Sequence, residues 1–496
     1  MKRHRNTPVI MILLLVAPLL AQAPRKPLFR VVDVNRGEPA DVALPDGKTV
    51  RLELLEAAET ADTVRGAVRL SRVRVRVNRE EVWLECASYR LPVTAGGVQV
   101  DCSVTKGLLA NSRNNPWGIE KDARLRVWPA GSPFLEPGTY MYPVKQRWFA
   151  TDTQMANQPS YVDGSEEPAA KRIYYHHGLD VGGAEGRTEV VSATEGRVVV
   201  RGRTVLPEYV KSPYTEVNYD GVIVLDDRGW FHWYFHLFSI DDGIKLGERV
   251  RMGQPVGLIG KEGSAGCWTH LHYEIRAPLE SGKPGIVEGY AFLWEAYQRQ
   301  YAPDVIAVAR PHSFVWVGET AKLDGSRSWA RRGVSRYQWT LSDGAAASGP
   351  VVTKTYARPG TYSEILKVTD RSGRHAYDFA VVQVVERQEA AKRGRDRVPP
   401  TIHASYYPAA NVRSGEPVTF FVRTCRTTHG EETWDFGDGS APVKVKSDGC
   451  AVEKSKEGYA RTAHVFRKPG DYLVKVERTN ERGETATARL WVPVSK

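Results

Sequence analysis

The sequence predicts an all-β, multidomain protein. Its 496 residues correspond to three or four domains at the usual ~100–200 residues per domain. Apolar and polar residues alternate along much of the chain, and 44 Gly and 30 Pro supply the tight turns that many short strands need. Hydrophobic residues make up 42% and charged residues 26%, close to globular averages, which excludes wholesale disorder and a polytopic membrane protein.

Residues 1–23 have the pattern of a secretory signal peptide. A basic start from Lys2 to Arg5 precedes an apolar run from Pro8 to Leu20, and the small-residue end Ala21-Gln22-Ala23 follows. The apolar run is shorter than the ~20 residues that span a bilayer, so a permanent anchor is the weaker interpretation. We therefore expect an exported protein, periplasmic or extracellular at the cell envelope, with no stable membrane insertion.

Export would permit disulfide bonds. Cys86 and Cys102 fall in one predicted domain, Cys425 and Cys450 fall in another, and each pair brackets a strand–turn–strand pattern. We predict that both pairs are bonded. Cys267 is then left over, and we expect it to be a buried free thiol that packs as a small hydrophobic side chain.

The net charge of +11 has two interpretations. It can be a solvated surface that keeps a secreted protein soluble, or it can attract the anionic polymers of a cell envelope. Nothing in the sequence resembles a nucleic-acid-binding motif, so nucleic acid is not expected as a partner.

Residues 24–139 predict a small N-terminal β domain. The clearest pattern is Arg72-Val73-Arg74-Val75-Arg76-Val77, whose period of two places the valines on one face of a strand and the arginines on the other. Turn candidates such as Asp46-Gly47 and Gly96-Gly97 interrupt the alternation. We interpret the arginine row as a solvated sheet face; a binding face is the alternative.

Residues 140–301 continue as short strands, including Val198 to Val200, Gly221 to Leu225 and Phe231 to Leu237. One helix is predicted, from Tyr290 to Tyr301, and it closes the region. Pro303 then begins a third unit.

Residues 303–387 and 400–496 are predicted to be two copies of one module, joined by a charged linker at 388–399. Each copy has an aromatic-rich strand that runs into an Asp-Gly turn, as in Trp434-Asp435-Phe436-Gly437-Asp438-Gly439, and later a Pro-Gly-x-Tyr corner. Such turns at this spacing are typical of a β-sandwich. The order of these motifs resembles the polycystic-kidney-disease (PKD) type of immunoglobulin-like domain, which implies contact with carbohydrate or protein.

Six of the twelve histidines lie between residues 176 and 272. The first group is His176-His177-Gly178-Leu179-Asp180, a His-x-Gly-x-Asp whose imidazole and carboxylate are both good zinc ligands. The glycine allows the bend that brings two ligands four residues apart together. Taken alone, this group is better explained by a turn with a His–Asp hydrogen bond.

Two alternating segments carry the other histidines. In His270-Leu271-His272-Tyr273-Glu274-Ile275 the two histidines share one face of a strand, with Leu271, Tyr273 and Ile275 toward a core. In the strand from Phe231 to Leu237, the polar row is His232, Tyr234 and His236. Each segment alone is also compatible with hydrogen-bonded histidines in a half-buried strand.

In this order, with Gly247-x-x-Val250-x-x-Gly253-Gln254-x-Val256-Gly257 between them, the motifs resemble the lysostaphin-type (LytM-like) zinc metallopeptidases over about residues 140–300. The resemblance implies a compact antiparallel-sheet domain with its site in a groove. His176, Asp180 and His272 would hold Zn²⁺, leaving the fourth position for water. His270 and His236 would be the catalytic histidines, as general base and as donors to the oxyanion. His232 and Tyr234 are expected to line the groove.

The leading hypothesis is therefore a secreted zinc metalloendopeptidase that hydrolyses peptidoglycan cross-link or stem peptides. One alternative is the same chemistry on extracellular proteins. Another is a non-catalytic cell-wall-binding scaffold or adhesion protein, in which the two C-terminal modules carry the function.

Overall fold

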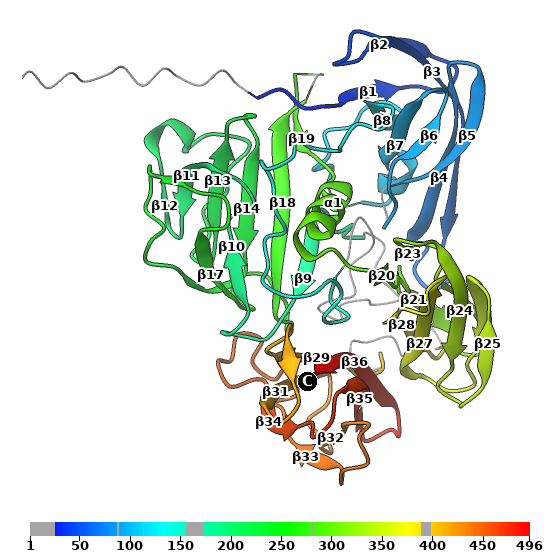
Figure 1. Cartoon of the computed structure of the whole chain (residues 1–496), viewed down its shortest axis with the longest axis vertical. Helices are drawn as coiled ribbons and strands as arrows, with labels where there is room; N and C mark the ends of the chain where they lie inside the picture. Colours follow the sequence, from blue (N-terminus) through cyan, green and yellow to red (C-terminus); the bar gives the residue numbers. More distant parts are fainter. Residues whose placement is uncertain (1–24, 87–88, 113, 155–172, 280–281, 388–397) are drawn as a thin grey trace, which may run out of the picture.

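The structure is a computed structural model that describes residues 25–86, 89–112, 114–154, 173–279, 282–387 and 398–496. The predicted signal peptide and nearly all of the predicted linker lie outside these residues. Strands dominate the described chain, so the predicted all-β class is confirmed (Figure 1). Among the described residues, no helix has both the length and the apolar character that crossing a bilayer would need.

The N-terminal region consists of two four-stranded sheets, ordered β1-β8-β7-β6 and β2-β3-β4-β5. Its elements are β1 (Arg30–Val34), β2 (Pro39–Ala43), β3 (Thr49–Ala61), β4 (Val68–Val77), β5 (Glu80–Glu85), β6 (Val93–Ala95), β7 (Val98–Thr105), the 3-10 turn η1 (Gly107–Leu109) and β8 (Ala123–Pro129). The inward side chains of both sheets form one hydrophobic core.

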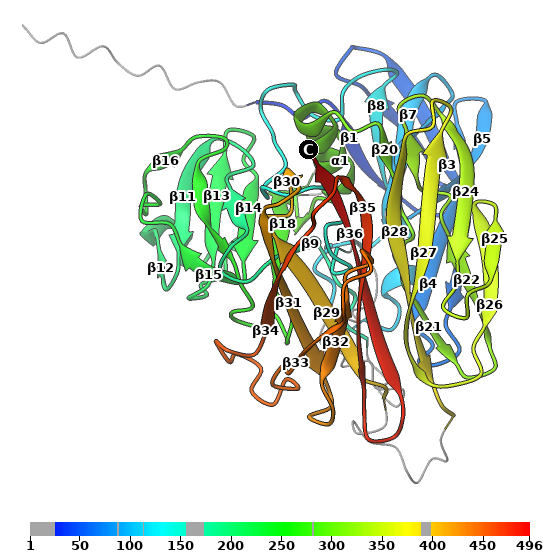
Figure 2. The same ribbon diagram turned by 60° about the horizontal axis from the view of Figure 1, so that its bottom comes forward.

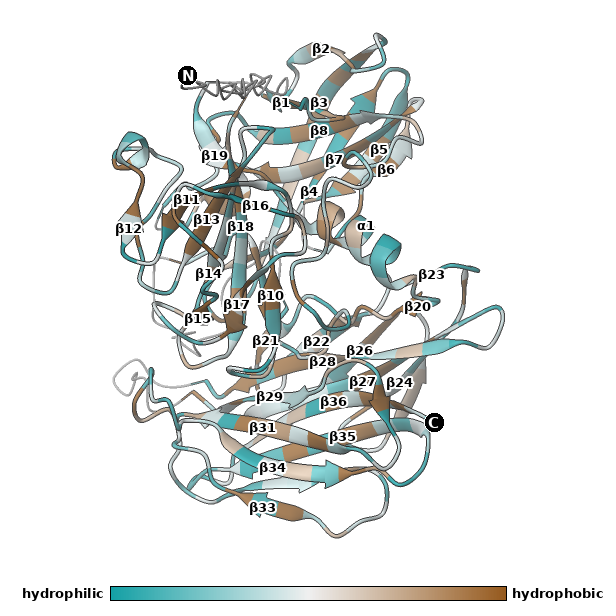
Figure 3. Ribbon diagram, turned by 60° about the vertical axis from the view of Figure 1, so that its left-hand side comes forward, coloured by the Kyte–Doolittle hydropathy of each residue, from teal (hydrophilic) through white to brown (hydrophobic). Residues whose placement is uncertain are grey.

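The predicted arginine row lies on β4. Val73, Val75 and Val77 are fully buried, and the alternation is visible as bands along the strands in Figure 3. Arg74 and Arg76 both pair with Glu81 at 3.0 Å. Because these guanidinium groups already have carboxylate partners on the outer face, the solvated-face interpretation accounts for the row.

The central region is built on an antiparallel sheet ordered β12-β11-β13-β14-β18-β19, with β9 paired to β18 and β16 to β11, and on a smaller sheet β10-β17-β15. The elements are β9 (Leu179–Gly182), β10 (Glu189–Val191), β11 (Gly196–Arg201), β12 (Thr204–Val205), η2 (Pro207–Tyr209), β13 (Val222–Asp226), β14 (Phe231–Phe235), β15 (Leu237–Ile240), β16 (Arg249–Val250), β17 (Pro255–Ile259), β18 (His270–Pro278) and β19 (Pro284–Ile286).

The strand predicted from Phe231 to Leu237 is divided in the structure. β14 ends at Phe235, and β15 begins at Leu237 in the other sheet. Between them His236 has a φ of +67°, a left-handed conformation that no continuing strand adopts. The apolar–polar alternation continues through this break, so periodicity alone could not reveal it.

The predicted helix is α1 (Tyr290–Tyr301). It ends at Ala302, which has a φ of +44°, and Pro303 follows, so the helix cannot continue. Its buried residues Phe292, Leu293 and Trp294 share a core with residues of both preceding regions. The helix therefore packs the N-terminal sheets against the central one (Figure 1).

The two C-terminal units are β-sandwiches. The first contains β20 (Val305–Ile306), β21 (Ser313–Trp316), β22 (Thr320–Asp324), β23 (Trp329–Ala330), β24 (Val334–Thr340), β25 (Ala346–Ser348), β26 (Val351–Thr355), β27 (Gly360–Asp370) and β28 (His375–Val385). The second contains β29 (Thr401–Tyr407), β30 (Val412–Arg413), β31 (Pro417–Cys425), β32 (Glu432–Asp435), β33 (Val443–Val445), β34 (Ala460–Val465), β35 (Gly470–Thr479) and β36 (Thr485–Ser495).

The internal repeat is evident in the cores of the sandwiches. Trp339 on β24 and Trp434 on β32 are both buried, each in the strand that precedes the Asp-Gly turn. The two units also share a sheet, because β27 pairs in parallel with β36 through Gly360 with Thr485 and Thr361 with Ala486. The result is one ten-stranded sheet across both sandwiches (Figure 2).

The structure corrects both predicted disulfides. Cys450 is bonded to Cys267 of the central region, with 6.1 Å between their Cα atoms, so the predicted Cys425–Cys450 pair and the free Cys267 thiol were wrong. Cys425 takes no part in this bond and is buried in the same cluster. Cys86 and Cys102 are adjacent but not bonded to each other. Pairing within a predicted domain failed because the partner of Cys450 lies 183 residues away.

Candidate active site

Three of the predicted site residues converge at the edge where β9 meets β18. Asp180 on β9 is the register partner of His272 on β18, and His176 lies just before β9. The Oδ1 atom of Asp180 is 3.0 Å from Nε2 of His176 and 2.9 Å from Nδ1 of His272. Those two imidazole nitrogens are 3.1 Å apart. Two imidazoles and one carboxylate therefore meet at one point, and all three residues could hold a metal ion together.

The turn that makes this convergence possible depends on Gly178. Its φ is +81°, and a Cβ at this position would lie 2.7 Å from the carbonyl oxygen of Tyr273. Only glycine fits both the conformation and the close approach of β18. This turn carries His176 back over the strand pair that holds Asp180 and His272.

A second carboxylate, that of Glu274, contacts the other ring nitrogen of His272, Nε2. Glu274 is 1% exposed, and its Oε2 atom lies 3.2 Å from Nε2 of His272 and 2.6 Å from Nδ1 of His177. Arg276 donates to its other oxygen. A proton on Nε2 of His272 satisfies Glu274 and leaves the Nδ1 lone pair directed at Asp180 and His176, which is the tautomer that binds a metal.

Burial and neighbouring charges shift the pKa values of these groups in opposite directions. Burial alone would lower the pKa of His272, but Asp180 and Glu274 raise it to about 10. Burial would raise the pKa of Asp180, but His176 and His270 hold it well below its usual range. The point where the side chains meet therefore stabilises positive charge, which a proton or a cation can supply.

His270 begins β18 and lies beside the cluster. Its Nδ1 faces the carbonyl oxygen of Trp268 at 3.0 Å. Because a carbonyl only accepts, Nδ1 carries the proton, and the Nε2 lone pair lies 3.4 Å from Oδ2 of Asp180. Burial lowers the pKa of His270 to about 3, against the opposing effect of Asp180. Its imidazole is therefore neutral near pH 7.

His236 is brought to the site by the break after β14. Its ring centroid is 4.9 Å from that of His270. Its Nδ1 lies 2.8 Å from the carbonyl oxygen of Glu262 and 3.2 Å from Oδ2 of Asp220. The backbone N–H of His236 also donates to Asp220 at 2.9 Å. These contacts fix the ring, and within the described part of the chain no group hydrogen-bonds its Nε2.

The prediction that His232 and Tyr234 line the groove was wrong. Both side chains are 0% exposed. His232 lies between Asp226, at 3.1 Å, and the hydroxyl of Tyr273, at 2.8 Å, and the Tyr234 hydroxyl accepts from the N–H of Ala193. β14 is buried on both faces, so its polar row faces an interior hydrogen-bond network.

Sequence reasoning missed the partners of the histidines. Asp220, Asp226 and Glu274 each hold an imidazole. Only Glu274 had a sequence signal, because it shares the strand face of His270 and His272. Asp220 precedes His236 by 16 residues, and only the pairing of distant segments shows that the two side chains meet.

An antiparallel sheet that gathers two imidazoles and a carboxylate, with two further imidazoles beside them, has the donor set of a metal-dependent hydrolase. Residues 174–284 match peptidase family M23, and residues 302–384 and 403–492 each match a PKD domain. The chain therefore has an M23 peptidase domain of the LytM/lysostaphin type followed by two PKD domains.

Solved structures similar to this chain include the antimicrobial peptidase lysostaphin from Staphylococcus simulans, which is 19% identical over 44% of this chain and 86% of that chain, with a TM-score of 0.20. Csd3 of Helicobacter pylori is 14% identical over 50% of this chain and 82% of that chain, with a TM-score of 0.19. A curated mouse protein, the dyslexia-associated protein KIAA0319-like protein, is 38% identical over 74 residues. That match covers 13% of this chain and only 7% of the mouse protein.

Proposed function

We propose that this protein is an exported, zinc-dependent endopeptidase that hydrolyses peptide bonds of bacterial peptidoglycan. One observation carries the proposal: the side-chain atoms of His176, Asp180 and His272 meet within about 3 Å of one another at the edge of the sheet. The peptidase family of the domain supports hydrolysis of a peptide bond. The peptidoglycan assignment rests on the resemblance to lysostaphin-type enzymes.

The donor set suits zinc. Two imidazole nitrogens and one carboxylate oxygen are common zinc ligands, and three protein ligands leave a fourth position open for water or substrate. Glu274 supports this assignment because it directs the Nδ1 lone pair of His272 to the shared point. When bound, zinc would supply a Lewis acid that polarises the scissile carbonyl and lowers the pKa of a water molecule to ~7.

The two other histidines provide proton transfer and charge stabilisation. The Nε2 lone pair of His270 would accept a proton from the attacking water and later deliver it to the leaving amine. When both of its ring nitrogens carry a proton, His236, held against Asp220, would donate from Nε2 to the oxygen that gains negative charge. Because neighbouring backbone or carboxylate groups fix both rings, little reorientation is needed during the reaction.

A single substitution tests the metal assignment. His272→Ala should abolish both zinc retention, measured by elemental analysis, and peptide hydrolysis. His429→Ala, at an exposed position in the second PKD domain, is the matched control and should behave as the unmodified protein. Hydrolysis that persists in His272→Ala would overturn the assigned mechanism.

The substrate is tested by digestion of purified sacculi and of a protein panel, with and without chelator, and the new amino termini are identified by mass spectrometry. Chelator-sensitive release of wall peptides is the expected result. Cleavage confined to the protein panel would favour an extracellular protease instead. Binding to sacculi with no cleavage of either substrate would favour a non-catalytic scaffold.

A further inference from the structure

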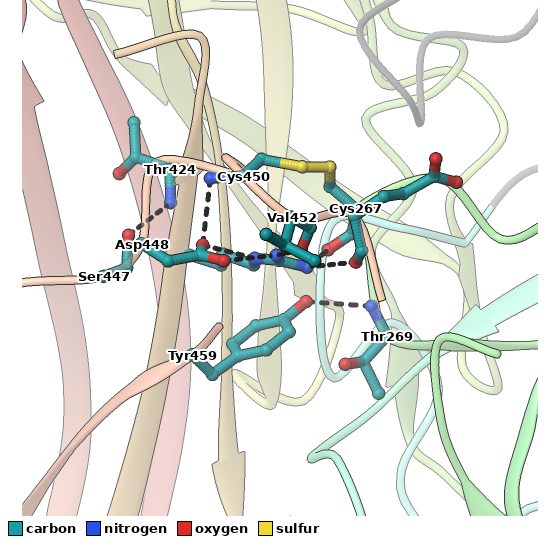
Figure 4. The surroundings of a disulfide bond; sticks show 10 residues. Cys267, Thr269, Thr424, Ser447, Asp448, Cys450, Val452 and Tyr459 are labelled. Carbon is teal, nitrogen blue, oxygen red and sulfur yellow. Dashed lines mark hydrogen bonds and ion pairs between the residues drawn. A yellow bond between two sulfur atoms is a disulfide. The ribbon is translucent and has the colours of Figure 1, made fainter. Parts of the chain in front are cut away.

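The three residues before His270 are all held by the second PKD domain. Cys267 is bonded to Cys450, and its carbonyl oxygen accepts from Arg423 at 3.1 Å. The ring of Trp268 packs against His403, with 5.5 Å between the centroids. The N–H of Thr269 donates to the hydroxyl of Tyr459 at 2.8 Å. Figure 4 shows how the disulfide and Tyr459 hold the two ends of this segment.

The holding groups are themselves fixed. Arg423 is fully buried and forms a paired contact with Asp448, at 2.9 and 2.7 Å. The Tyr459 hydroxyl accepts from Thr269 and donates to Nδ1 of His403 at 2.8 Å, so both of its hydrogen-bonding roles are used. Because Tyr459 is only 4% exposed, water cannot readily replace it as the partner of the Thr269 N–H.

This segment sets the orientation of His270. The carbonyl oxygen of Trp268, in the middle of the segment, accepts a hydrogen bond from Nδ1 of His270 at 3.0 Å. A shift of that carbonyl would rotate the ring or change its tautomer, and the Nε2 lone pair would then turn away from Asp180.

We propose that the second PKD domain completes the active site, with Tyr459 and the Cys267–Cys450 disulfide as positioning groups for His270. The expected loss of rate rests on the proposed function. The positioning of His270 by the second PKD domain does not, because it is argued from the contacts alone. None of these PKD side chains is among the zinc ligands proposed above, so their loss should alter catalysis and leave zinc retention intact.

The test uses Tyr459→Phe in the full chain, which removes one hydroxyl and keeps the ring. With the peptide that the unmodified protein cleaves fastest, kcat should fall by about 10- to 100-fold, because small displacements of a catalytic group cost rate in this range. KM and zinc content should stay unchanged. Tyr472→Phe is the matched control: its hydroxyl bonds Lys468 within the same domain, and it should behave as the unmodified protein.

Hydrogen exchange separates this inference from the proposed function. The Thr269 amide should exchange at least about ten times faster in Tyr459→Phe than in the unmodified protein, whether or not any peptide is cleaved. If the unmodified protein cleaves nothing, the proposed function fails. The exchange rate of the Thr269 amide then still shows whether Tyr459 positions this segment. Unchanged exchange, or a kcat that falls only together with zinc content, would overturn the inference.

A double variant, Cys267→Ala with Cys450→Ala, keeps the inference testable if Tyr459→Phe does not fold. It should show the same loss of kcat with zinc retained. Replacing both cysteines prevents either one from pairing with Cys425. A folded double variant with unchanged kcat and unchanged exchange of Thr269 would rule out a positioning role for the disulfide.

Discussion

At the scale of single residues, the hydrogen-bond acceptor on one ring nitrogen fixes the tautomer of three histidines of the site, His272, His270 and His236. Nε2 of His272 faces Glu274, Nδ1 of His270 faces a backbone carbonyl, and Nδ1 of His236 faces the Glu262 carbonyl and Asp220. These partners select one tautomer for each ring. The chemistry of the cluster is therefore set as much by its hydrogen-bond acceptors as by the imidazoles themselves.

Glu274→Gln should weaken zinc binding by about 10- to 100-fold, because an amide can turn its N–H toward His272 and disfavour the metal-binding tautomer. Zinc affinity is measured by competition with a chelator of known affinity. Glu208→Gln, in an exposed pair with Arg197, is the control and should leave the affinity unchanged. Equal affinities of the two variants would show that Glu274 does not orient the ligand.

Asp226 should make the stability of the fold depend on pH in the acid range. Burial would raise its pKa, but His232 and Arg228 lower it to about 2 in the folded protein. A lowered pKa stabilises the fold above the unfolded value of ~3.9, and this stabilisation, about 2 kcal/mol, is lost as the pH falls toward 2.

In denaturant titrations between pH 6 and pH 2, Asp226→Asn should therefore be less stable than the unmodified protein at pH 6. The difference between the two proteins should shrink as the pH falls. A difference in stability that stays constant over the whole range would contradict this assignment to Asp226.

At the scale of elements, the site depends on two backbone breaks, the left-handed turn at Gly178 and the left-handed residue His236 between β14 and β15. The first was predicted, because a glycine between two ligands is visible in the sequence. The second was not, since a histidine at positive φ leaves no sequence signal. For the same reason the groove residues were misassigned: alternation shows two faces of a strand, but it cannot show that both faces of β14 are covered.

Gly178→Ala should disrupt the metal site. The substitution places a Cβ 2.7 Å from the Tyr273 carbonyl and costs about 1–2 kcal/mol for the left-handed conformation alone. Gly229 has the same kind of φ, +80°, but a Cβ added there would meet nothing within 4 Å. Gly229→Ala should thus share the conformational cost and keep zinc, whereas Gly178→Ala should lose zinc affinity, as measured by chelator competition. Equal zinc affinity in both variants would show that the close approach is not needed.

At the scale of the whole molecule, local motifs predicted the domain types and their order, whereas long-range contacts were not predictable. The fold class and the helix α1 follow from patterns within short segments, and the three proposed ligands follow from the family resemblance that the order of these segments carries. The disulfide between Cys267 and Cys450 and the contacts of Tyr459 join segments almost 200 residues apart, and periodicity carries no information at that distance.

Arg147 joins the central region to the second sandwich. Its Nε donates to the Tyr406 hydroxyl at 3.0 Å, another of its nitrogens donates to the carbonyl of Trp491, and its guanidinium lies 4.6 Å from the Trp491 ring. Arg147→Ala should destabilise this contact by about 2 kcal/mol. Calorimetry should show a lower first unfolding temperature, and Arg467→Ala, at an exposed position, should show no such change. Identical temperatures for the two variants would mean that Arg147 does not hold the domains together.

The parallel pairing of β27 with β36 has a mechanical consequence. Tandem modules joined only by a linker swivel, so the reach of an attached enzyme is set by the length and stiffness of that linker. Here two backbone pairs, Gly360 with Thr485 and Thr361 with Ala486, join the two modules in one sheet, so we expect them to move together. A surface that binds this pair of modules would then meet the candidate active site at one height and one angle.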